Sequence, residues 1–372
     1  MIPFKIGLPA TLSGRHAIQG KESFRGIKLF TEDLHARGGI KMQGKPSLLP
    51  ELVFYDDESI PEKTKENTLR LIETDRVDIL LGPYSSGLAL ACTEAVGERQ
   101  RVVWNYGGSL DDIPSHSLCR VVSTASGASS YFQAIVDMIH YCYAQVAEIA
   151  VLRLAGSRFS ETVCEGALLR AKELGMATAV YNFSSGTQDF STILSAAGSR
   201  GASCVLCCGR MEDDINLARC IRKNHIRDFK VVATLAAAVN EFKKRLGPET
   251  DGFVSTSQWE PTLSISPDFG PSPSEFSDTF SRVWGYTPDY TAAQSYNMGV
   301  IIRELTERMG TTNEQTLAHQ ALRSEFKTFY GDFSIDLKTL KQTGHRMLVT
   351  QWQDGEKKIV FPTEYSNSQL VV

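Results

Sequence analysis

The chain has 372 residues, a net charge of −4 and 42% hydrophobic residues. This length exceeds the usual size of a single core, so it predicts about two domains. The charge, and the lack of a long basic run, exclude nucleic acid as an expected partner. The longest apolar runs have strand length, so we expect no membrane insertion. No signal peptide precedes the first expected strand, which leaves a cytoplasmic protein or one whose leader is absent from this sequence.

Short apolar segments recur along the first 110 residues, and helical stretches or glycine-rich turns separate them. The expected strands are residues 4–9, 52–56, 77–81 and 101–106. Apolar residues at helical spacing predict a helix after the first strand, ending at Gly38-Gly39. Ser59-Ile60-Pro61-Glu62 predicts a capping box with proline in the first turn of the next helix.

From about residue 123 the alternation of helices and strands starts again. The expected strands are residues 148–152, 178–183, 203–209 and 230–235, and the expected helices include 127–145, 190–197 and 213–224. Two successive runs of this kind predict two parallel-sheet lobes. Three further helices are expected at 274–284, 290–309 and 313–324, then strands within 329–335 and 345–361 with a hairpin turn at Asp354-Gly355.

Cys204-Val205-Leu206-Cys207 has the C-x-x-C form of some redox and metal sites. It lies inside an apolar run that also predicts a buried strand, and no second cysteine pair lies at zinc spacing. Buried thiols behave as small hydrophobic groups, so we expect no metal site. The eight cysteines are Cys92, Cys119, Cys142, Cys164, Cys204, Cys207, Cys208 and Cys220.

The segment Leu81-Gly82-Pro83-Tyr84-Ser85-Ser86-Gly87 joins an expected strand to an expected helix. A helix start carries unpaired N–H donors and partial positive charge, so this junction suits an anionic or carbonyl ligand. The alternative is that Ser85 or Ser86 serves only as an N-cap.

The sequence contains none of the catalytic and nucleotide-binding motifs G-x-S-x-G, G-x-x-x-x-G-K-[ST] and G-x-G-x-x-G. His16 lies in a loop without an obvious carboxylate partner, and Asp56-Asp57 suits a capping or turn role better than a metal site. We therefore predict no catalytic residue and no cofactor.

Polar and aromatic residues instead follow several expected strands. Such a set suits an organic ligand with a carboxylate or amide group. The two tyrosines also suit the core, and Arg210 also suits a solvated helix start. The predicted ligand-binding residues are Tyr84, Ser85, Ser86, Tyr106, Gly107, Ser109, Arg158, Phe159 and Arg210.

The sequence resembles the type I periplasmic solute-binding proteins, in the group of leucine/isoleucine/valine-binding proteins and amide-binding regulators. The resemblance extends from end to end. It is carried by Ile6-Gly7 with Ser13-Gly14, Gly38-Gly39-Ile40, Tyr55-Asp56-Asp57 with Pro61, residues 81–86, Gly331 with Phe333, and Trp352, Asp354-Gly355 and Val360-Phe361-Pro362.

This resemblance implies an α/β fold of two doubly wound parallel-sheet lobes joined by three crossover strands. The crossings are expected near residues 123–126, 256–260 and 328–331. Lobe 1 would then hold residues 1–123 and 259–328, and lobe 2 residues 124–258 and 329–372. A ligand would be captured between the lobes by hinge closure.

The resemblance also implies solute capture for an ABC permease in the periplasm or outside the cell, without catalysis. Ser86, Gly107 and Ser109 match the positions that hold the ligand carboxylate. The acid that pairs the ligand ammonium in the amino-acid binders is missing from residues 233–237, and Arg210 replaces an expected aromatic residue. Because a buried ammonium needs a counter-charge, we expect a carboxylate or amide ligand rather than a zwitterionic amino acid. The alternatives are a cytoplasmic ligand-sensing regulator and, third, a serine hydrolase that uses Ser85 or Ser86.

Overall fold

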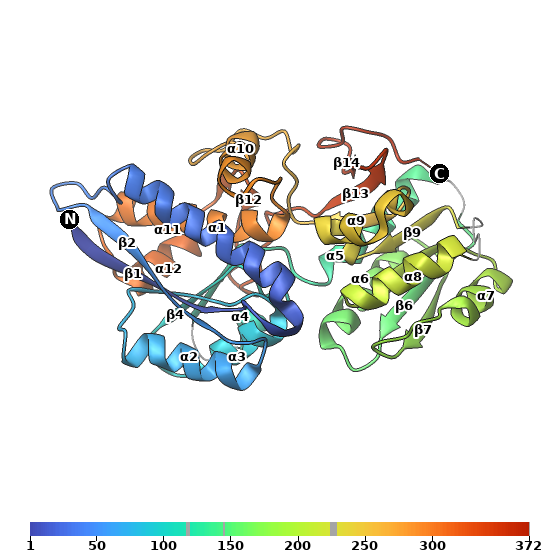
Figure 1. The fold of residues 1–372 in the computed structure, drawn as a ribbon, viewed down its shortest axis with the longest axis horizontal. Helices are drawn as coiled ribbons and strands as arrows, with labels where there is room; N and C mark the ends of the chain where they lie inside the picture. Colours follow the sequence, from blue (N-terminus) through green and yellow to red (C-terminus); the bar gives the residue numbers. More distant parts are fainter. Residues whose placement is uncertain (117–119, 144–145, 224–228, 372) are drawn as a thin grey trace. The chain divides into compact units, whose positions relative to one another are not determined.

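The computed structural model describes residues 1–116, 120–143, 146–223 and 229–371. The chain divides into two compact units, each built from two segments (Figure 1). Unit 1 consists of residues 1–127 and 264–346, and unit 2 of residues 128–263 and 347–372. The chain therefore passes between the units three times.

Unit 1 contains a five-stranded parallel sheet in the order β2-β1-β3-β4-β5. Helices α1 and α11 lie on one face of this sheet, and α2 and α3 lie on the other (Figure 1). The strands are β1 Ile2–Ala10, β2 Leu48–Asp56, β3 Ile79–Leu81, β4 Val102–Asn105 and β5 Arg120–Ser123, and the helices are η1 Gly14–His16, α1 Ala17–Ala36, α2 Pro61–Glu73, α3 Ser86–Val96, α4 Ile113–His116, α10 Pro273–Trp284, α11 Tyr290–Met309 and α12 Glu314–Ala321. A separate hairpin pairs β11 Phe326–Thr328 with β12 Gly331–Phe333.

Unit 2 contains a seven-stranded sheet in the order β14-β13-β10-β9-β8-β6-β7, in which only β13 runs in the opposite direction and pairs antiparallel with both β10 and β14. Its strands are β6 Glu148–Leu154, β7 Thr178–Phe183, β8 Ala202–Cys208, β9 Val231–Thr234, β10 Val254–Ser257, β13 Leu348–Gln353 and β14 Glu356–Phe361, and its helices are α5 Ser130–Cys142, α6 Arg158–Glu173, α7 Ser191–Ser199, α8 Met211–Lys223, η2 Ala236–Ala238, α9 Asn240–Leu246 and η3 Gly247–Thr250. The order β7-β6-β8-β9-β10 repeats the order of unit 1. The predicted doubly wound two-lobe fold is therefore present, and the repetition is one of topology.

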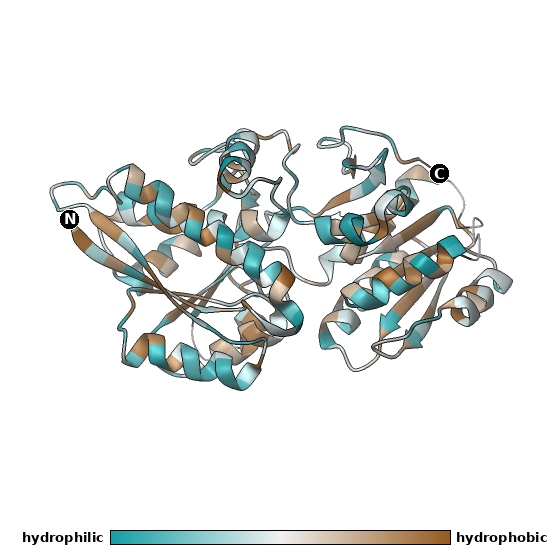
Figure 2. Ribbon diagram, viewed as in Figure 1, coloured by the Kyte–Doolittle hydropathy of each residue, from teal (hydrophilic) through white to brown (hydrophobic). Residues whose placement is uncertain are grey.

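The inner parallel strands of unit 2, β6, β8, β9 and β10, are buried on both faces, which explains the apolar sequences of β6, β8 and β9. Ile149 and Val151 pack into the core under α5 and α6, whereas Ala150 and Leu152 pack into the core under α7, α8 and α9. Figure 2 shows these strands as largely hydrophobic ribbons beneath amphipathic helices.

The C-x-x-C segment lies in strand β8, as predicted. Cys204 contributes to the first of these cores and Cys207 to the second. Residues three apart in a strand point to opposite faces, so these two thiols cannot pair with each other. None of the seven cysteines in the described ranges forms a disulfide, and Cys119 lies outside these ranges.

Some local expectations differ from the structure or lie outside the described residues. No capping box opens α2: its N-cap is Ile60, and the Ser59 hydroxyl instead donates to the Ser13 carbonyl and accepts from the His16 N–H. Strands β5 and β10 begin at Arg120 and Val254, three and two residues before the crossover strands expected near residues 123–126 and 256–260. The ends of two expected helices, residues 144–145 and 224, lie outside the described residues.

Residues 329–346 belong to unit 1, whereas the sequence placed residues after 328 in the second lobe. The Phe329 ring lies against Phe276 and Tyr296 of unit 1, with centroid distances of 4.8 and 5.8 Å. Aromatic packing on α10 and α11 therefore keeps this segment with the first unit.

A capping box does occur at the start of α10, where Ser272 and Glu275 exchange side-chain and backbone hydrogen bonds. We expect Ser272→Ala to lower the free energy of unfolding by about 1 kcal/mol, because it leaves a first-turn N–H without its acceptor. Urea denaturation measures this loss. Ser272→Asp, which keeps an acceptor, should retain the wild-type stability, and an equal loss in both variants would contradict the capping role.

Among the described residues, none of the helices has both the length and the apolar character needed to span a bilayer.

Candidate functional site

The carboxyl ends of β1, β3 and β4 lie side by side in unit 1, because these strands are neighbours in the sheet. The helices after β1 and β3 cover opposite faces, so this edge is the switch point at which ligands bind in doubly wound sheets. The structure brings two groups of predicted residues together there. The loop after β3 carries Tyr84, Ser85 and Ser86, and the loop after β4 carries Tyr106, Gly107 and Ser109.

Ser85 joins strand β3 to helix α3 with an unusual backbone conformation. Its φ of 89° and ψ of 145° lie in a region that favours glycine, although the residue is serine. Its Oγ atom is buried and has no hydrogen-bond partner. A buried unpaired hydroxyl destabilises the fold, and such strain concentrates at ligand sites. Ser85 is therefore the strongest single indication of a ligand site in unit 1.

Ser86 has a different role from its neighbour. Its hydroxyl oxygen accepts hydrogen bonds from the N–H groups of Ser109 and Leu110, both at 3.1 Å. This hydroxyl thus holds the loop after β4 in place. Ser85, rather than Ser86, presents the hydroxyl that has no partner in the protein.

The loop after β4 approaches the loop after β3 closely. The Ser85 N–H donates to the Gly107 carbonyl at 3.2 Å. A Cβ atom on Gly107 would lie 2.5 Å from the Pro83 carbonyl oxygen and 2.8 Å from Tyr84 Cα, so only glycine fits at this position. Gly107, predicted as a ligand-binding residue, thus allows the two loops to approach each other closely.

Asn105 shapes the same loop, and the sequence prediction missed it. Its side chain is 1% exposed, and its Oδ1 atom accepts from the Gly108 N–H at 2.9 Å. Its Nδ2 atom donates to the Gly108 carbonyl at 2.7 Å and to Ser123 Oγ at 2.9 Å. An asparagine at a strand end, just before Gly107-Gly108, is the local signal that points to this role.

The two tyrosines lie in different environments. Tyr84 is half-buried, and its ring meets the His16 ring edge-on with 6.5 Å between centroids. Tyr106 is 2% exposed, and burial raises the pKa of its hydroxyl well above the ordinary range. Tyr84 is therefore partly exposed at this edge, whereas Tyr106 is a core residue, the alternative that the sequence left open.

Asp56 and Asp57 organise the turns around this edge. The Asp56 carboxylate accepts from the N–H groups of Leu12 and Ser13 and from the Ser13 hydroxyl. Burial raises the pKa of Asp56, but these hydrogen bonds outweigh it and the net shift is downward. Asp57 is fully buried, and desolvation raises its pKa to about 6. Asp56 and Asp57 also accept hydrogen bonds from the N–H groups two residues ahead, of Glu58 and Ser59, so both acids have the turn role that the sequence favoured.

In unit 2 the remaining predicted residues follow the neighbouring strands β6 and β8. Arg158 is the exposed first residue of α6. Phe159 is half-buried, and its ring meets Tyr131 edge-on at 5.8 Å. Arg210 is exposed, and its Nη1 atom donates to Ser185 Oγ at 3.1 Å. The switch point of the second sheet therefore carries two arginines and one aromatic ring.

Two consecutive buried acids, which the sequence analysis did not select, tie the loops of this edge together. Asp213 accepts from the N–H groups of Gly186 at 2.7 Å and Arg210 at 3.1 Å. Asp214 accepts from the N–H groups of Gly209 at 3.0 Å and Ala236 at 2.9 Å. Burial raises the pKa of Asp214 to about 7. Paired aspartates in the first turn of a helix just after a strand are the signal in the sequence.

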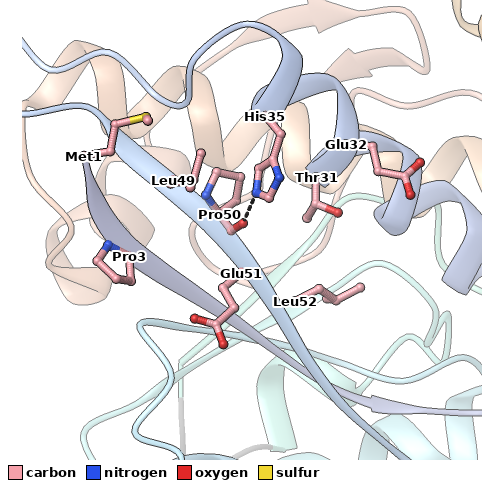
Figure 3. A pocket seen from close by; sticks show the side chains of 9 residues that line it. All are labelled: Met1, Pro3, Thr31, Glu32, His35, Leu49, Pro50, Glu51 and Leu52. Atoms are coloured by element: carbon pink, nitrogen blue, oxygen red, sulfur yellow. Dashed lines mark hydrogen bonds between the residues drawn. The ribbon is translucent and has the colours of Figure 1, made fainter.

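A hollow of about 370 Å³ lies elsewhere on unit 1, between α1 and the β1–β2 edge (Figure 3). Two of its lining residues are joined by a 2.5 Å hydrogen bond between His35 Nε2 and the Pro50 carbonyl oxygen. Its lining residues are Met1, Pro3, Thr31, Glu32, His35, Leu49, Pro50, Glu51 and Leu52. Because Met1 and Pro3 lie at the amino end of β1, this hollow is distinct from the carboxyl edge, and none of the predicted site residues lines it.

Within the described ranges, histidine, cysteine and acidic side chains form no group of three or more that is suited to a metal ion.

Comparisons with known proteins agree with this architecture. The family model of the periplasmic binding proteins matches residues 3–357. A relative from Brucella abortus, named Leu/Ile/Val-binding protein homolog 7, is 23% identical over 98% of this chain and 93% of its own length.

Two solved structures illustrate the similarity of fold. A leucine-binding protein from Thermotoga maritima has a TM-score of 0.81 and 18% identity, over 96% of this chain and 97% of its own. A solute-binding protein of an ABC transporter from R. palustris, solved with benzoate, has a TM-score of 0.77 and 18% identity, over 96% and 95% of the two chains. With a family model that covers nearly its whole length, the chain belongs to the periplasmic binding protein family.

Proposed function

We propose that this protein is the extracytoplasmic solute-binding component of an ABC importer and delivers a small organic ligand to its permease. Membership of the periplasmic binding protein family supports this role. The Brucella relatives carry the name of leucine/isoleucine/valine-binding homologues, and the R. palustris protein belongs to an ABC transporter. In this proposal the protein binds its ligand and catalyses no reaction.

The Ser85 hydroxyl carries the proposal, because it is buried, unpartnered and held by a strained backbone. It lies at the N-terminus of α3, where the first-turn N–H groups have no partner within the helix. A ligand carboxylate accepts hydrogen bonds from both kinds of donor, and the helix dipole favours its negative charge.

We further propose a carboxylate or amide ligand that carries no ammonium. Residues 233–237 contain no acid. Each oxygen of Asp213 and Asp214 already accepts a backbone N–H, so these two acids are engaged within the protein. Arg210 instead offers a guanidinium, which suits an anion. Among proteins of the same fold, one from Streptococcus pneumoniae was solved with isoleucine and the R. palustris protein with benzoate. Benzoate has the chemistry that we propose.

A thermal-shift panel on the wild type tests whether the protein binds a solute and which class of ligand it binds. We expect benzoate, aliphatic carboxylates or short amides to raise the melting temperature of the wild type, and leucine to leave it unchanged. A ligand at 100 times its Kd adds about 2.7 kcal/mol to the stability. A shift with amino acids alone would refute the proposed ligand class. If no compound in the panel shifts the melting temperature, the proposal that the protein binds a solute of these classes is wrong.

Replacing Ser85 should separate binding from stability. We expect Ser85→Ala and Ser85→Gly to weaken ligand binding about tenfold or more, because each removes one hydrogen bond to a charged group. Ser85→Gly should unfold at the wild-type temperature or higher, since glycine adopts the positive φ without strain. Ser199→Ala, at an exposed helix position of unit 2, serves as the control. Unchanged affinity in both Ser85 variants would contradict the site.

A cytoplasmic ligand-sensing regulator is the second candidate function. The lack of a disulfide among the seven described cysteines favours it, because disulfides form readily outside the cytoplasm. Fractionation of the native cells decides between the two: recovery in the periplasm supports the transport role, and recovery in the cytosol supports the regulator.

A further inference from the structure

We propose that Asp213 is a positioning residue for Arg210, which it holds in the conformation that binds an anionic ligand group. The proposal rests on the proposed function and concerns unit 2 alone. Asp213 itself does not contact the ligand in this scheme, because both of its carboxylate oxygens face backbone N–H groups.

The contacts form a closed ring around Arg210. Asp213 Oδ2 accepts from the Arg210 N–H at 3.1 Å, which fixes the main chain of the arginine. Asp213 Oδ1 accepts from the Gly186 N–H at 2.7 Å, across 27 residues of sequence. Ser185, the residue before Gly186, accepts the hydrogen bond of Arg210 Nη1 at 3.1 Å. One carboxylate therefore fixes the base of the arginine and the loop that supports its guanidinium.

The chemistry of this position requires a carboxylate. Asp213 is 1% exposed, so water cannot replace a lost acceptor easily. An ionised carboxyl group accepts hydrogen bonds on both oxygens, whereas an amide has one acceptor and one donor nitrogen. Asp213→Asn would therefore leave either Gly186 or Arg210 without its acceptor and release one side of the ring.

The position of the arginine matters because its side chain is long and exposed. A flexible arginine loses rotamer freedom when it binds an anion, and a supported one has lost much of this freedom already. The support from Asp213 and Ser185 should thus increase affinity for a carboxylate, with no effect on a neutral ligand that does not use the guanidinium.

The first experiment needs no ligand. Phenylglyoxal modifies accessible arginines, and mass spectrometry of the full-length protein measures the rate at Arg210. We expect Asp213→Asn to raise this rate severalfold and Ser185→Ala to raise it less. Glu212→Gln, which removes an adjacent exposed acid paired with Arg245, should leave the rate at its wild-type value. An unchanged rate in Asp213→Asn would overturn the positioning role.

The second experiment is a double-mutant cycle with Arg210→Gln, followed by calorimetry with benzoate and benzamide as probes. We expect Asp213→Asn and Arg210→Gln each to lower the affinity for benzoate about tenfold. The double variant should bind benzoate as tightly as Arg210→Gln does. None of these substitutions should change the affinity for benzamide. Additive losses, or equal losses with benzamide, would show that Asp213 acts only on the fold.

The variants must remain folded for this comparison, and their urea midpoints establish that. Ser185→Ala removes only the support of the guanidinium, so it keeps the proposal testable if Asp213→Asn unfolds. A wild type that fails to bind benzoate would contradict the ligand class in the proposed function. The modification rate would still decide whether Asp213 holds Arg210.

Discussion

Gly107→Ala is expected to weaken ligand binding more than any other substitution proposed for unit 1. The new Cβ would overlap the Pro83 carbonyl oxygen, only 2.5 Å away, and would press on Tyr84 Cα. Backbone atoms cannot give way as a flexible side chain does, so the loop that carries Ser85 must move. The hydrogen bond from the Ser85 N–H to the Gly107 carbonyl would be lost with it. We expect at least a hundredfold weaker binding of any ligand that shifts the wild type, measured by calorimetry.

The same substitution should lower the free energy of unfolding by about 1–3 kcal/mol, as is usual for overpacking. Gly198→Ala is the matched control, because a Cβ there meets nothing within 4 Å and lies on an exposed helix. It should leave binding unchanged and stabilise the helix slightly. Wild-type affinity in Gly107→Ala would show that the loop after β3 does not form the site.

Asp214→Asn is expected to change how the stability of the protein depends on pH. Burial raises the folded-state pKa of Asp214 from 3.8 to about 7. The native state therefore binds the proton more tightly than the unfolded chain does, and protonation stabilises the fold. This stabilisation is complete below about pH 4 and is lost as the pH rises through about 7. At 1.36 kcal/mol per pKa unit, the wild type should lose about 4 kcal/mol relative to Asp214→Asn across this range.

Urea denaturation at several pH values between 4 and 8 measures the difference between the two proteins. Asp57 contributes to the wild-type profile with the same sign up to about pH 6, and it does so equally in both proteins. Glu212→Gln is the control: the hydrogen bond from Arg245 lowers the pKa of Glu212, so its effect lies below about pH 4.5. Parallel pH profiles for the wild type and Asp214→Asn would show that the buried carboxyl group titrates normally.

The sequence by itself determined the elements whose formation depends on near neighbours. Helix α11 begins and ends where the sequence predicted it, at Tyr290 and Met309. Asp354 and Gly355 have the positive φ angles, 50° and 74°, that the hairpin turn requires. The burial of Cys204 and Cys207 followed from an apolar run of strand length. These features depend on residues that are close together in the sequence, so local sequence patterns predict them.

Part of the candidate site was also predictable, because the carboxyl end of a strand is recognisable from the helix that follows it. The sequence selected the loops of Ser85, Gly107 and Arg210 on this ground, and the strand order places the first two side by side in unit 1. Which atom of each residue faces a partner was not predictable. Ser86 and Ser85 are adjacent serines, yet only the structure shows that one hydroxyl holds Ser109 and the other has no partner.

Only the tertiary structure decided the contacts between loops that are distant in sequence. Asp213 meets Gly186, Asp214 meets Ala236, and Phe329 packs on Phe276, because strand order and helix packing bring these segments together. The capping box formed at Ser272 rather than Ser59, since Ser59 finds partners in a different loop. Local patterns determine which elements form, whereas hydrogen bonds and packing between distant segments determine what each side chain does.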